Sequence, residues 1–541
     1  MSSDSNPSLF KAGLQIDPAK VFYAVCLVFV VDRVLAFQRK RKAMNYLSGI
    51  RSAFPPLSPA GVLFSTKWWQ AAVDVIWIRR HELWRNQETI SVVPWFLGSE
   101  YIYTANLDVM KQIISTGQTR STFVKSPETV TGVSLFGDNV FTTEGDEWRK
   151  HRRIMSPAFG NSLYQLVWDQ SVKTYRDMIA GEGWENKKSF DVPAIQKATF
   201  KFALIVLGVC SFGFDFDWTA PATVSDGEMS AQEAMRIVID NYIFLTFAPG
   251  WVKRLPFKSF KQSLRAYNLL DKFMQDQVNI RREEIRGHAS GEYKRKDAFS
   301  MLVQANESDE NAKNKLSDRD LIGNVFVMLI AGHETTASTF AATLGYLAIN
   351  PQAQDEAVKQ IVDVVGWDRD PEFSDYNNLN KVLATFFEAL RLFPAAYIMI
   401  RRPKEDFVLD IPNPRDQEGT QPFPIPKGTW AVIDMVGIHR NPRYYEDPEE
   451  YKPSRWHAVP NDSEQFTAFS FGPRTCIGRK FATTEAVAFL TVLLRDWKVE
   501  PLLQSGETPE GWKKRVMDAK LGFTMVVHTD VPLKFTRRER F

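Results

Sequence analysis

The stretch FSFGPRTCIG, residues 469–478, places a single cysteine among glycine, proline and arginine. Glycine lets backbone N–H groups approach a neighbouring sulfur, and a helix expected from Arg479 would turn its positive N-terminal end toward Cys476. Such surroundings favour the thiolate, the form of cysteine that binds a metal ion. The other cysteines, Cys26 and Cys210, lie in apolar runs, and three scattered cysteines form no disulfide framework or paired metal knuckle. The loop therefore predicts that Cys476 has a chemical role as a thiolate and not a structural one.

A second candidate is AGHETT, residues 331–336, in the middle of a long apolar helix. Ser317 and Asp320 have the spacing of a capping box, and Pro351 would end the helix after about 32 residues, roughly 48 Å. Glycine and threonine are poor helix formers, and a buried acid is costly. The motif is compatible with a solvated face or a packing notch. It is also compatible with a local distortion that opens a groove and points Glu334 and Thr335 at a ligand.

Two other spacings place polar side chains on one face of a helix. Glu388 and Arg391 are three residues apart, and Trp148 and Arg152 are four apart. Taken alone, the first is an ordinary surface ion pair and the second a basic solvated face. Arg455 lies in a third polar segment, PSRW, at residues 453–456.

The elements around these residues predict a mainly α protein with small β-sheets. Helical patterns run from about residue 104 to 400, short β-like runs punctuated by proline and glycine follow, and helix returns at 479–496. The 541 residues, 44% hydrophobic and 13% aromatic, suffice for a large core, and a net charge of +3 gives no basic field for nucleic acid. We expect a single large catalytic domain over residues 90–541.

The N-terminal part predicts a membrane anchor over residues 1–42. The apolar run 21–31 is interrupted by Asp32 and Arg33, continues to Phe37 and ends in the basic cluster 39–42. An interfacial helix and a core helix are the alternatives, and a spanning helix with this cluster would leave the remaining chain in the cytosol. Residues 43–89 are expected to form a linker, stiffened by the FPPLSP stretch, with a candidate interfacial segment.

That segment carries Trp68, Trp69, Trp77 and Trp84 among arginines. Indole rings beside cations suit a lipid headgroup region, and buried helix packing is the equally weighted alternative.

Taken together, these segments resemble the cytochrome P450 family of haem-thiolate monooxygenases, from about residue 90 to the C-terminus, and are most similar to fungal microsomal members. The family pattern F-x-x-G-x-R-x-C-x-G is complete in residues 469–478, and A/G-G-x-D/E-T-T/S is complete in 331–336. E-x-x-R and W-x-x-x-R are also present, while the usual P-E-R-F/W element carries Ser454 in place of glutamate. The resemblance implies the cytochrome P450 fold behind the anchor.

The resemblance also implies haem b with Cys476 as its axial thiolate ligand. Phe469 and Gly478 would shape that ligand loop, and Arg474, Trp148, Arg152 and Arg401 would pair the haem propionates, with the neighbouring Arg402 an open alternative to Arg401. Thr335 would hydrogen-bond oxygen at the haem, and Glu334 would deliver protons through water. Glu388, Arg391 and Arg455 would form a structural ion network on the thiolate side.

The implied reaction inserts one oxygen atom from O2 into a lipophilic substrate, with a terpenoid, triterpenoid or sterol favoured. The pocket would be lined by residues 130–140, Phe244, Phe247, Ile330, Ala331 and 395–399, although the aromatic residues from Phe244 to Phe257 could equally form a membrane-dipping surface. Electrons would come from NADPH through a separate cytochrome P450 reductase, with cytochrome b5 as an optional second donor, at the endoplasmic reticulum membrane facing the cytosol.

Other functions compatible with the same motifs are hydroxylation of foreign compounds or aromatic hydrocarbons, and a haem-thiolate isomerase, dehydratase or peroxide-using enzyme. A non-enzymatic haem sensor is a third class. The intact Glu334–Thr335 pair argues against the enzymes that do not activate oxygen and against the sensor.

Overall fold

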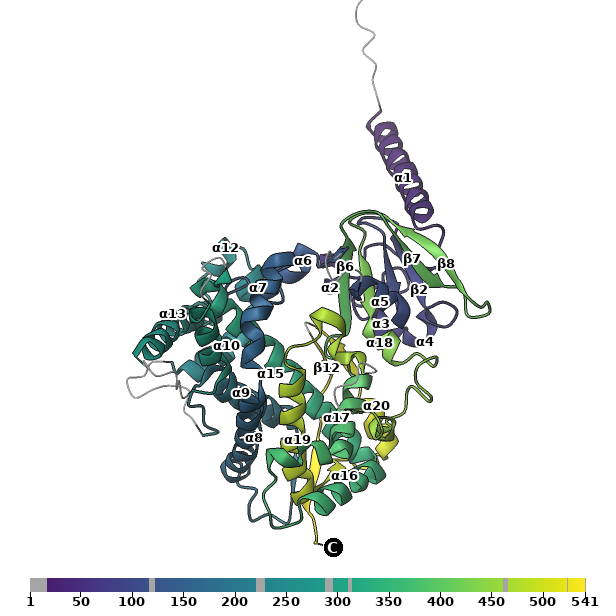
Figure 1. Ribbon diagram of the computed structural model, residues 1–541. Coiled ribbons are helices and arrows are strands. Elements are labelled where there is room, and N and C mark those ends of the chain that lie inside the picture. The colour runs from purple at the N-terminus through teal and green to yellow at the C-terminus, as the bar shows by residue number, and fades with distance from the viewer. Residues whose placement is uncertain are drawn as a thin grey trace, which may run out of the picture. The chain divides into compact units, whose positions relative to one another are not determined.

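The computed structural model describes residues 17–115, 122–219, 229–287, 295–309, 314–460, 466–522 and 524–540. The chain divides into two compact units. Unit 1 contains residues 1–78 and 90–103, and unit 2 contains residues 79–89 and 104–541. Figure 1 shows the elements of both, and residues 1–16 of the expected anchor lie outside the described part of the chain.

Unit 1 begins with α1 (Pro18–Ala43), a helix of 26 residues. Its first part is exposed, whereas residues 32, 33, 36, 37, 40, 41 and 44 form a partly buried face at helical spacing. On that face Arg33 donates to the carbonyl of Phe96 at 3.0 Å, and the Lys40 ammonium donates to the carbonyls of Pro94 at 3.1 Å and Gly98 at 2.7 Å. The C-terminal half of α1 therefore packs against the loop 94–98.

The rest of unit 1 is folded where we expected a linker. β1 (Gly49–Ser52) pairs in parallel with β2 (Thr89–Pro94), and β3 (Tyr101–Thr104) follows. Two short helices, α2 (Pro59–Leu63) and α3 (Val75–Ile78), lie between. Pro55 and Pro56 are buried, and the backbone N–H of Phe54 donates to Gln70. The prolines stiffen a packed segment and not an exposed tether.

The tryptophan-rich segment divides between its two expected roles. Trp68 is 89% exposed and Trp69 is 36% exposed, as an interfacial segment requires. Trp77 and Trp84 are each only 7% exposed, and the Trp84 indole N–H donates to the carboxylate of Asp434 at 3.0 Å. Interfacial surface is therefore restricted to the first pair.

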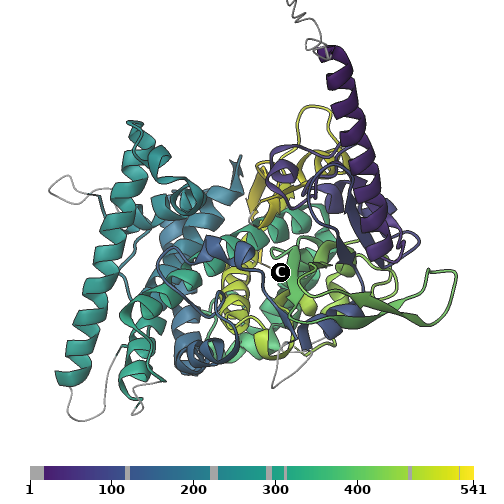
Figure 2. The same ribbon diagram turned by 90° about the horizontal axis from the view of Figure 1, so that it is seen from above.

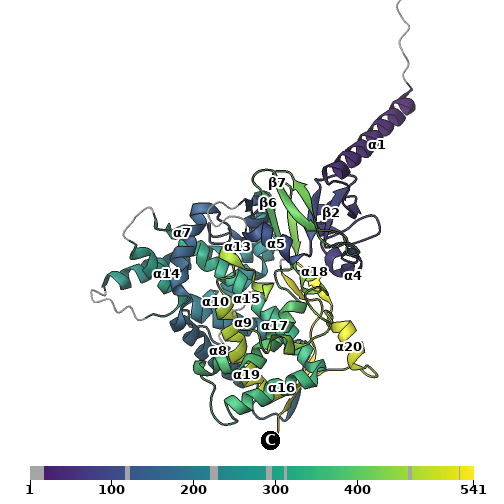
Figure 3. The same cartoon turned by 45° about the vertical axis from the view of Figure 1, so that its right-hand side comes forward.

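Unit 2 is built mainly from helices. Those before the central helix α15 (Asp318–Ile349) are α4 (Arg80–Leu83), α5 (Leu107–Ser115), α6 (Pro127–Val130), α7 (Gly145–Met155), α8 (Asn161–Gly181), α9 (Ile195–Phe212), α10 (Ala231–Asp240), α11 (Tyr242–Phe247), α12 (Gly250–Lys253), α13 (Lys258–Gly287) and α14 (Ala298–Glu307). Those after it are α16 (Pro351–Val364), α17 (Asn380–Leu392), α18 (Met435–His439), α19 (Arg479–Asp496) and α20 (Pro509–Val516). Helix α15 packs on α9 and α17, and α19 packs on α8, α16 and α17 (Figures 1 and 3).

Helix α15 is the element that crosses the core of unit 2. The Ser317 side chain accepts from the backbone N–H of Asp320 and the Asp320 carboxylate accepts in return, so the predicted capping box is confirmed, as is the length of 32 residues. The helix is continuous through residues 331–336, so it has no break there. The Thr335 hydroxyl instead donates to the carbonyl of Ala331 at 2.6 Å, a bond that threonine makes within a regular helix.

The strands of unit 2 form small sheets, which confirms the predicted fold class. β4 (Phe123–Val124), β6 (Ile398–Pro403) and β9 (Ala431–Asp434) pair antiparallel, and β7 (Phe407–Pro412) forms a hairpin with β8 (Thr420–Ile425). β13 (Leu533–Arg537) pairs with both β10 (Trp497–Pro501) and β5 (Ser189–Val192). A last hairpin joins β11 (Ala519–Leu521) to β12 (Met525–Val527). Figure 2 shows the helices of unit 2 from above.

Candidate functional site

The Cys476 loop folds back on itself before α19. The backbone N–H of Cys476 donates to the carbonyl of Phe469 at 2.9 Å, and Gly472 adopts a φ of +70°, which favours glycine. The Phe469 ring packs edge-on against Phe387 with centroids 6.5 Å apart. α19 then begins at Arg479, as expected from the sequence. The loop presents the sulfur just before the N-terminus of a helix of 18 residues.

The surroundings of the Cys476 sulfur act on the pKa of its thiol in opposite directions. The Cys476 side chain is exposed, yet enough protein surrounds it that desolvation raises the pKa of its thiol. The backbone N–H groups of Gly478 and Arg479 and the positive charges of Arg152 and Arg479 act to lower that pKa. Cys210, by contrast, is fully buried, and desolvation raises the pKa of its thiol well above the usual range. Of these two thiols only Cys476 is accessible and surrounded by donors to a thiolate.

Arg474 joins the loop to the chain before and within α7. Its guanidinium donates to the carbonyl of Thr143 at 3.0 Å, forms an ion pair with Glu144 at 2.5 Å and lies 4.2 Å above the Trp148 ring. Burial and the nearby charges of Arg401 and Arg152 lower the pKa of Arg474 to about 10. Arg474 therefore lies in a partly buried place that it shares with two other arginines and one carboxylate.

Arg152 and Arg401 extend the same cluster. Arg152 donates to the carbonyl of Thr475 at 3.4 Å. Burial lowers the pKa of Arg401, and Glu144 partly offsets the effect. Arg402 alternates to the other face of β6, where its charge acts on Glu128. The geometry thus brings Arg401, and not Arg402, to the cluster around Glu144.

Lys125 is a fourth cation of this cluster, and the sequence analysis missed it. Lys125 is only 8% exposed. Its ammonium lies 4.4 Å above the Phe141 ring and donates to the backbone carbonyl of Phe141. Desolvation, with Arg474 and Arg401 nearby, lowers the pKa of Lys125 well below its usual range. No local pattern marks this lysine, since only the fold brings it to the loop.

The middle of α15 differs from the rest of the helix. Residues 321–330 and 336–348 are buried, but Ala331 is exposed and Gly332, Glu334 and Thr335 are half-buried. The Glu334 carboxylate accepts from the Thr524 hydroxyl at 2.6 Å. Desolvation raises the pKa of Glu334, and the bond from Thr524 opposes that rise. The acid and the alcohol of AGHETT therefore lie on the accessible stretch of an otherwise buried helix.

Glu388, Arg391 and Arg455 are brought together in one network. Glu388 and Arg391 are 0% exposed and form a two-pronged ion pair with bonds of 2.8 and 2.9 Å. Arg455 donates to the same carboxylate at 3.1 Å, and the Trp456 indole does so at 2.9 Å. The ordinary surface ion pair is thus excluded, because this pair lies in the core.

The residues expected to line a pocket fall into two groups. Ala396 is exposed between the buried Ala395 and Tyr397, and Ala331 is exposed between the buried Ile330 and the half-buried Gly332, as small residues facing a hollow would be. Phe247 lies against Gly132, whose added Cβ would meet the ring at 3.4 Å. Phe244 instead stacks on Phe260 with centroids 4.3 Å apart.

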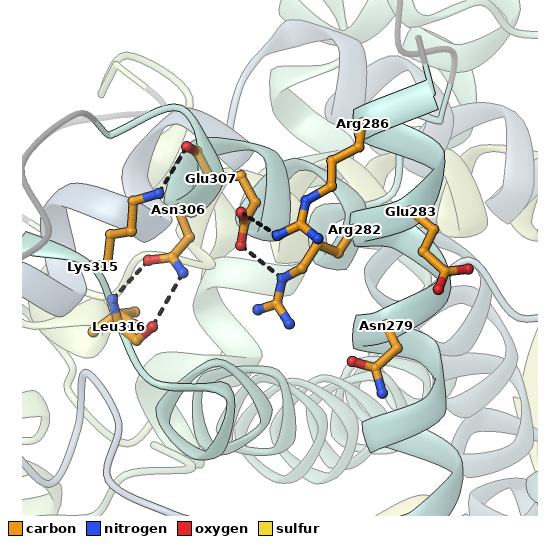
Figure 4. A pocket seen from close by; sticks show the side chains of 8 residues that line it. All are labelled: Asn279, Arg282, Glu283, Arg286, Asn306, Glu307, Lys315 and Leu316. Carbon is orange, nitrogen blue, oxygen red and sulfur yellow. Dashed lines mark hydrogen bonds and ion pairs between the residues drawn. The ribbon is translucent and has the colours of Figure 1, made fainter.

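A polar surface pocket of about 490 Å³ lies elsewhere, between α13, α14 and the start of α15 (Figure 4). Its cations are engaged within the protein: Arg282 pairs with Glu307 at 2.8 Å and with Asp318 at 2.6 Å. It contains none of the predicted site residues, which gather instead at the Cys476 loop and the middle of α15.

Comparison with known proteins agrees with this geometry. A sequence model described as Cytochrome P450 matches residues 63–525. Cytochrome P450 monooxygenase 124 of Postia placenta is 34% identical, over 86% of this chain and 88% of the relative. Cytochrome P450 4F5 of Rattus norvegicus is 28% identical, over 68% of this chain and 69% of the relative. The crystal structure of cytochrome P450DA heme domain has the same fold, with a TM-score of 0.67 and 20% identity over 91% of this chain and 98% of that one. This chain belongs to the cytochrome P450 family of haem-thiolate monooxygenases.

Proposed function

We propose that this protein is a membrane-anchored monooxygenase that inserts one oxygen atom from O2 into a lipophilic organic substrate, with a terpenoid, triterpenoid or sterol favoured. The observation that carries the proposal is the accessible Cys476 beside a cluster of buried cations, together with an acid and an alcohol on the accessible stretch of α15. The cysteine and the cations suit a haem cofactor, and the acid and the alcohol suit proton delivery.

The cation cluster fits a cofactor that carries carboxylates. Three cationic side chains, Lys125, Arg401 and Arg474, lie near the single carboxylate of Glu144. Arg152 lies near Arg474 and Cys476 and adds a fourth positive charge. Two added propionates would offset most of this charge, because with Glu144 they would set three carboxylates against four cations, and buried charges are stable only when paired. Arg474, Arg152, Arg401 and Lys125 would hold the propionates, and Trp148 would keep the Arg474 guanidinium in place. Cys476 would bind the iron, and haem held by a thiolate supplies activation of O2.

Glu334 and Thr335 would move protons and order water. The raised pKa of Glu334 brings its titration closer to neutral pH, where an acid can both accept and release a proton. The Thr335 hydroxyl has its proton committed to the carbonyl of Ala331 in this structure, so its lone pairs remain to accept from a water. The pair would pass protons from solvent to the accessible side of α15.

The substrate preference rests on the side chains expected around the pocket. Ala331 and Ala396 are small and exposed, and Val133 and Phe136, which are buried, belong to the expected 130–140 lining. Few polar groups are available to anchor a ligand, so recognition by shape and apolar contact is favoured.

The membrane and the redox partner complete the proposal. In the described chain, α1 and α9 are long and apolar enough to cross a bilayer, but α9 is mostly buried in unit 2. α1 would anchor the protein in the endoplasmic reticulum membrane with its basic end, residues 39–42, in the cytosol. An NADPH-dependent reductase would supply electrons at a basic surface formed by Arg149, Lys150, Arg153, Arg479 and Lys480. Arg149 and Arg153 of that surface already pair with Asp146 and Asp309, so the attraction for a partner is reduced.

The test is the absorbance spectrum of the reduced carbon monoxide complex. The full-length protein should show the long-wavelength Soret band of a thiolate-bound haem. Cys476→Ala should lose this band, whereas Cys210→Ala, the matched control, should retain it. A thiolate spectrum in Cys476→Ala would overturn the assignment of the ligand.

A further inference from the structure

We infer that Thr524 is a positioning residue: its hydroxyl holds the Glu334 carboxylate in the orientation from which that acid delivers protons. The inference rests on the proposed function of Glu334 and adds a residue that lies 190 positions away in the chain. Thr524 precedes β12 in the hairpin with β11, far from every sequence motif of the site.

The first support is the bond itself. The Thr524 hydroxyl lies 2.6 Å from Oε1 of Glu334, and Thr524 is 5% exposed. Within the described residues, Thr524 is the only side chain that donates a hydrogen bond to this carboxylate. A short bond to a charged acceptor in a desolvated place is strong, so it can select one orientation of a flexible glutamate.

The second support is that the hairpin is fixed independently of Glu334. The Tyr397 hydroxyl donates to the carbonyl of Gly522 at 2.7 Å, and the backbone N–H of Met525 donates to the carbonyl of Ala395 at 3.0 Å. Two bonds on either side of Thr524 therefore tie the turn to the segment after α17. Because Thr524 cannot follow the carboxylate, the bond restrains the carboxylate.

The third support is the charge around the acid. Among the described residues, Tyr242 of α11 is the titratable side chain whose pKa responds to Glu334, and that pKa lies above its usual range because of burial. His333, the neighbour in sequence, faces α9 instead, where its ring bonds the carbonyl of Phe200 at 3.0 Å, and burial lowers its pKa to about 4. Neither carries a positive charge at neutral pH, so the Thr524 hydroxyl is what favours the ionised form of Glu334.

The consequence is a control on proton delivery. The bond favours the ionised form of Glu334 and holds its carboxylate in one orientation, so the acid can take up a proton and pass it on. Without the bond, the acid would be neutral over a wider pH range and would sample several orientations, and either change slows transfer.

The test measures the titration of Glu334 directly. Infrared difference spectra of the full-length, haem-loaded ferric protein are recorded against pH, and the Glu334 carboxyl band is assigned by its loss in Glu334→Gln. Thr524→Val keeps the shape of the side chain and removes the hydroxyl, so the midpoint should rise by about one pH unit. Thr524→Ser should restore the wild-type midpoint. Thr529→Val, at an exposed threonine after the same hairpin, is the matched control and should titrate like wild type.

A second measurement separates the inference from the function on which it rests. NADPH oxidation by the protein with purified reductase, in the absence of organic substrate, is followed against pH. Glu334→Gln should remove the pH dependence, and Thr524→Val should shift it upward together with the infrared midpoint. If Glu334→Gln keeps the wild-type profile, both roles are overturned. If Glu334→Gln removes it while Thr524→Val matches wild type in both measurements, the role of Thr524 alone is overturned.

Discussion

Replacing Arg391 by methionine removes the donor half of the buried ion pair while keeping most of its volume. The lost guanidinium makes two bonds to Glu388 and three to the carbonyls of His439, Pro448 and Glu450, at 2.7 to 2.9 Å. Breaking a buried pair in this way costs about 3–5 kcal/mol. We therefore expect Arg391→Met to lower the free energy of unfolding by that amount.

The surroundings set the comparison. Arg455 bonds the same carboxylate once, at 3.1 Å, and its side chain is 14% exposed. Its loss leaves Glu388 with Arg391, the Trp456 indole and the Lys452 backbone N–H. Arg455→Met should therefore cost about 1.5–3 kcal/mol, the scale of one hydrogen bond to a charged group.

The assay is urea unfolding of the full-length protein, followed by haem absorbance and by tryptophan fluorescence and compared through the transition midpoints. Arg391→Lys, which keeps the charge but not the two-pronged geometry, should fall between wild type and Arg391→Met. If Arg391→Met yields no folded protein, Arg391→Lys still ranks against Arg455→Met. The reasoning is refuted if Arg455→Met is as destabilised as the Arg391 variants.

His439 tests pH dependence: burial, with Arg391 nearby, lowers its pKa from 6.5 to about 3. The unfolded state therefore binds more protons between these values, so stability should fall as pH drops through that window, by up to about 1.4 kcal/mol per unit, and His439→Gln should flatten the fall in a urea titration. Lys125→Met should release haem to apomyoglobin faster than wild type, whereas Lys111→Met, at an exposed lysine paired with Asp108, should not. Deleting residues 1–42 should reduce pelleting with membranes while haem is retained in the pellet-free fraction, and unchanged pelleting would assign membrane binding to Trp68 and Trp69 instead.

Local features of this protein could be predicted from its sequence, and long-range ones could not. The capping box at Ser317 and the start of α19 depend on residues within one or two turns, and both were predicted where they occur. The pairing of β5 with β13, and the bond from Thr524 to Glu334 190 positions away, join residues far apart in the chain, and no spacing encodes them.

The family resemblance supplied part of the remaining information, but only at positions that have motifs. It pointed to Arg474 and Arg152, but not to Lys125, which has none. The sequence left open whether α15 breaks at residues 331–336. The helix is continuous there, and the Thr335 hydroxyl donates to the carbonyl of Ala331 one turn back.

The packing of α1 against the loop 94–98 limits how much apolar helix is left to match the thickness of a bilayer. Outside the packed face, the apolar run 21–31 provides roughly 17 Å of helix, at about 1.5 Å per residue, against a hydrocarbon layer of about 30 Å. An inserted α1 would therefore meet a layer thicker than its exposed apolar length, and local thinning would relieve the mismatch. Local thinning would bring Trp95 and Leu97 of that loop, which are 42% and 51% exposed, to the lipid surface. In a thick bilayer, the force on α1 would reach the β1–β2 pair of unit 1 through the hydrogen bonds of Arg33 and Lys40.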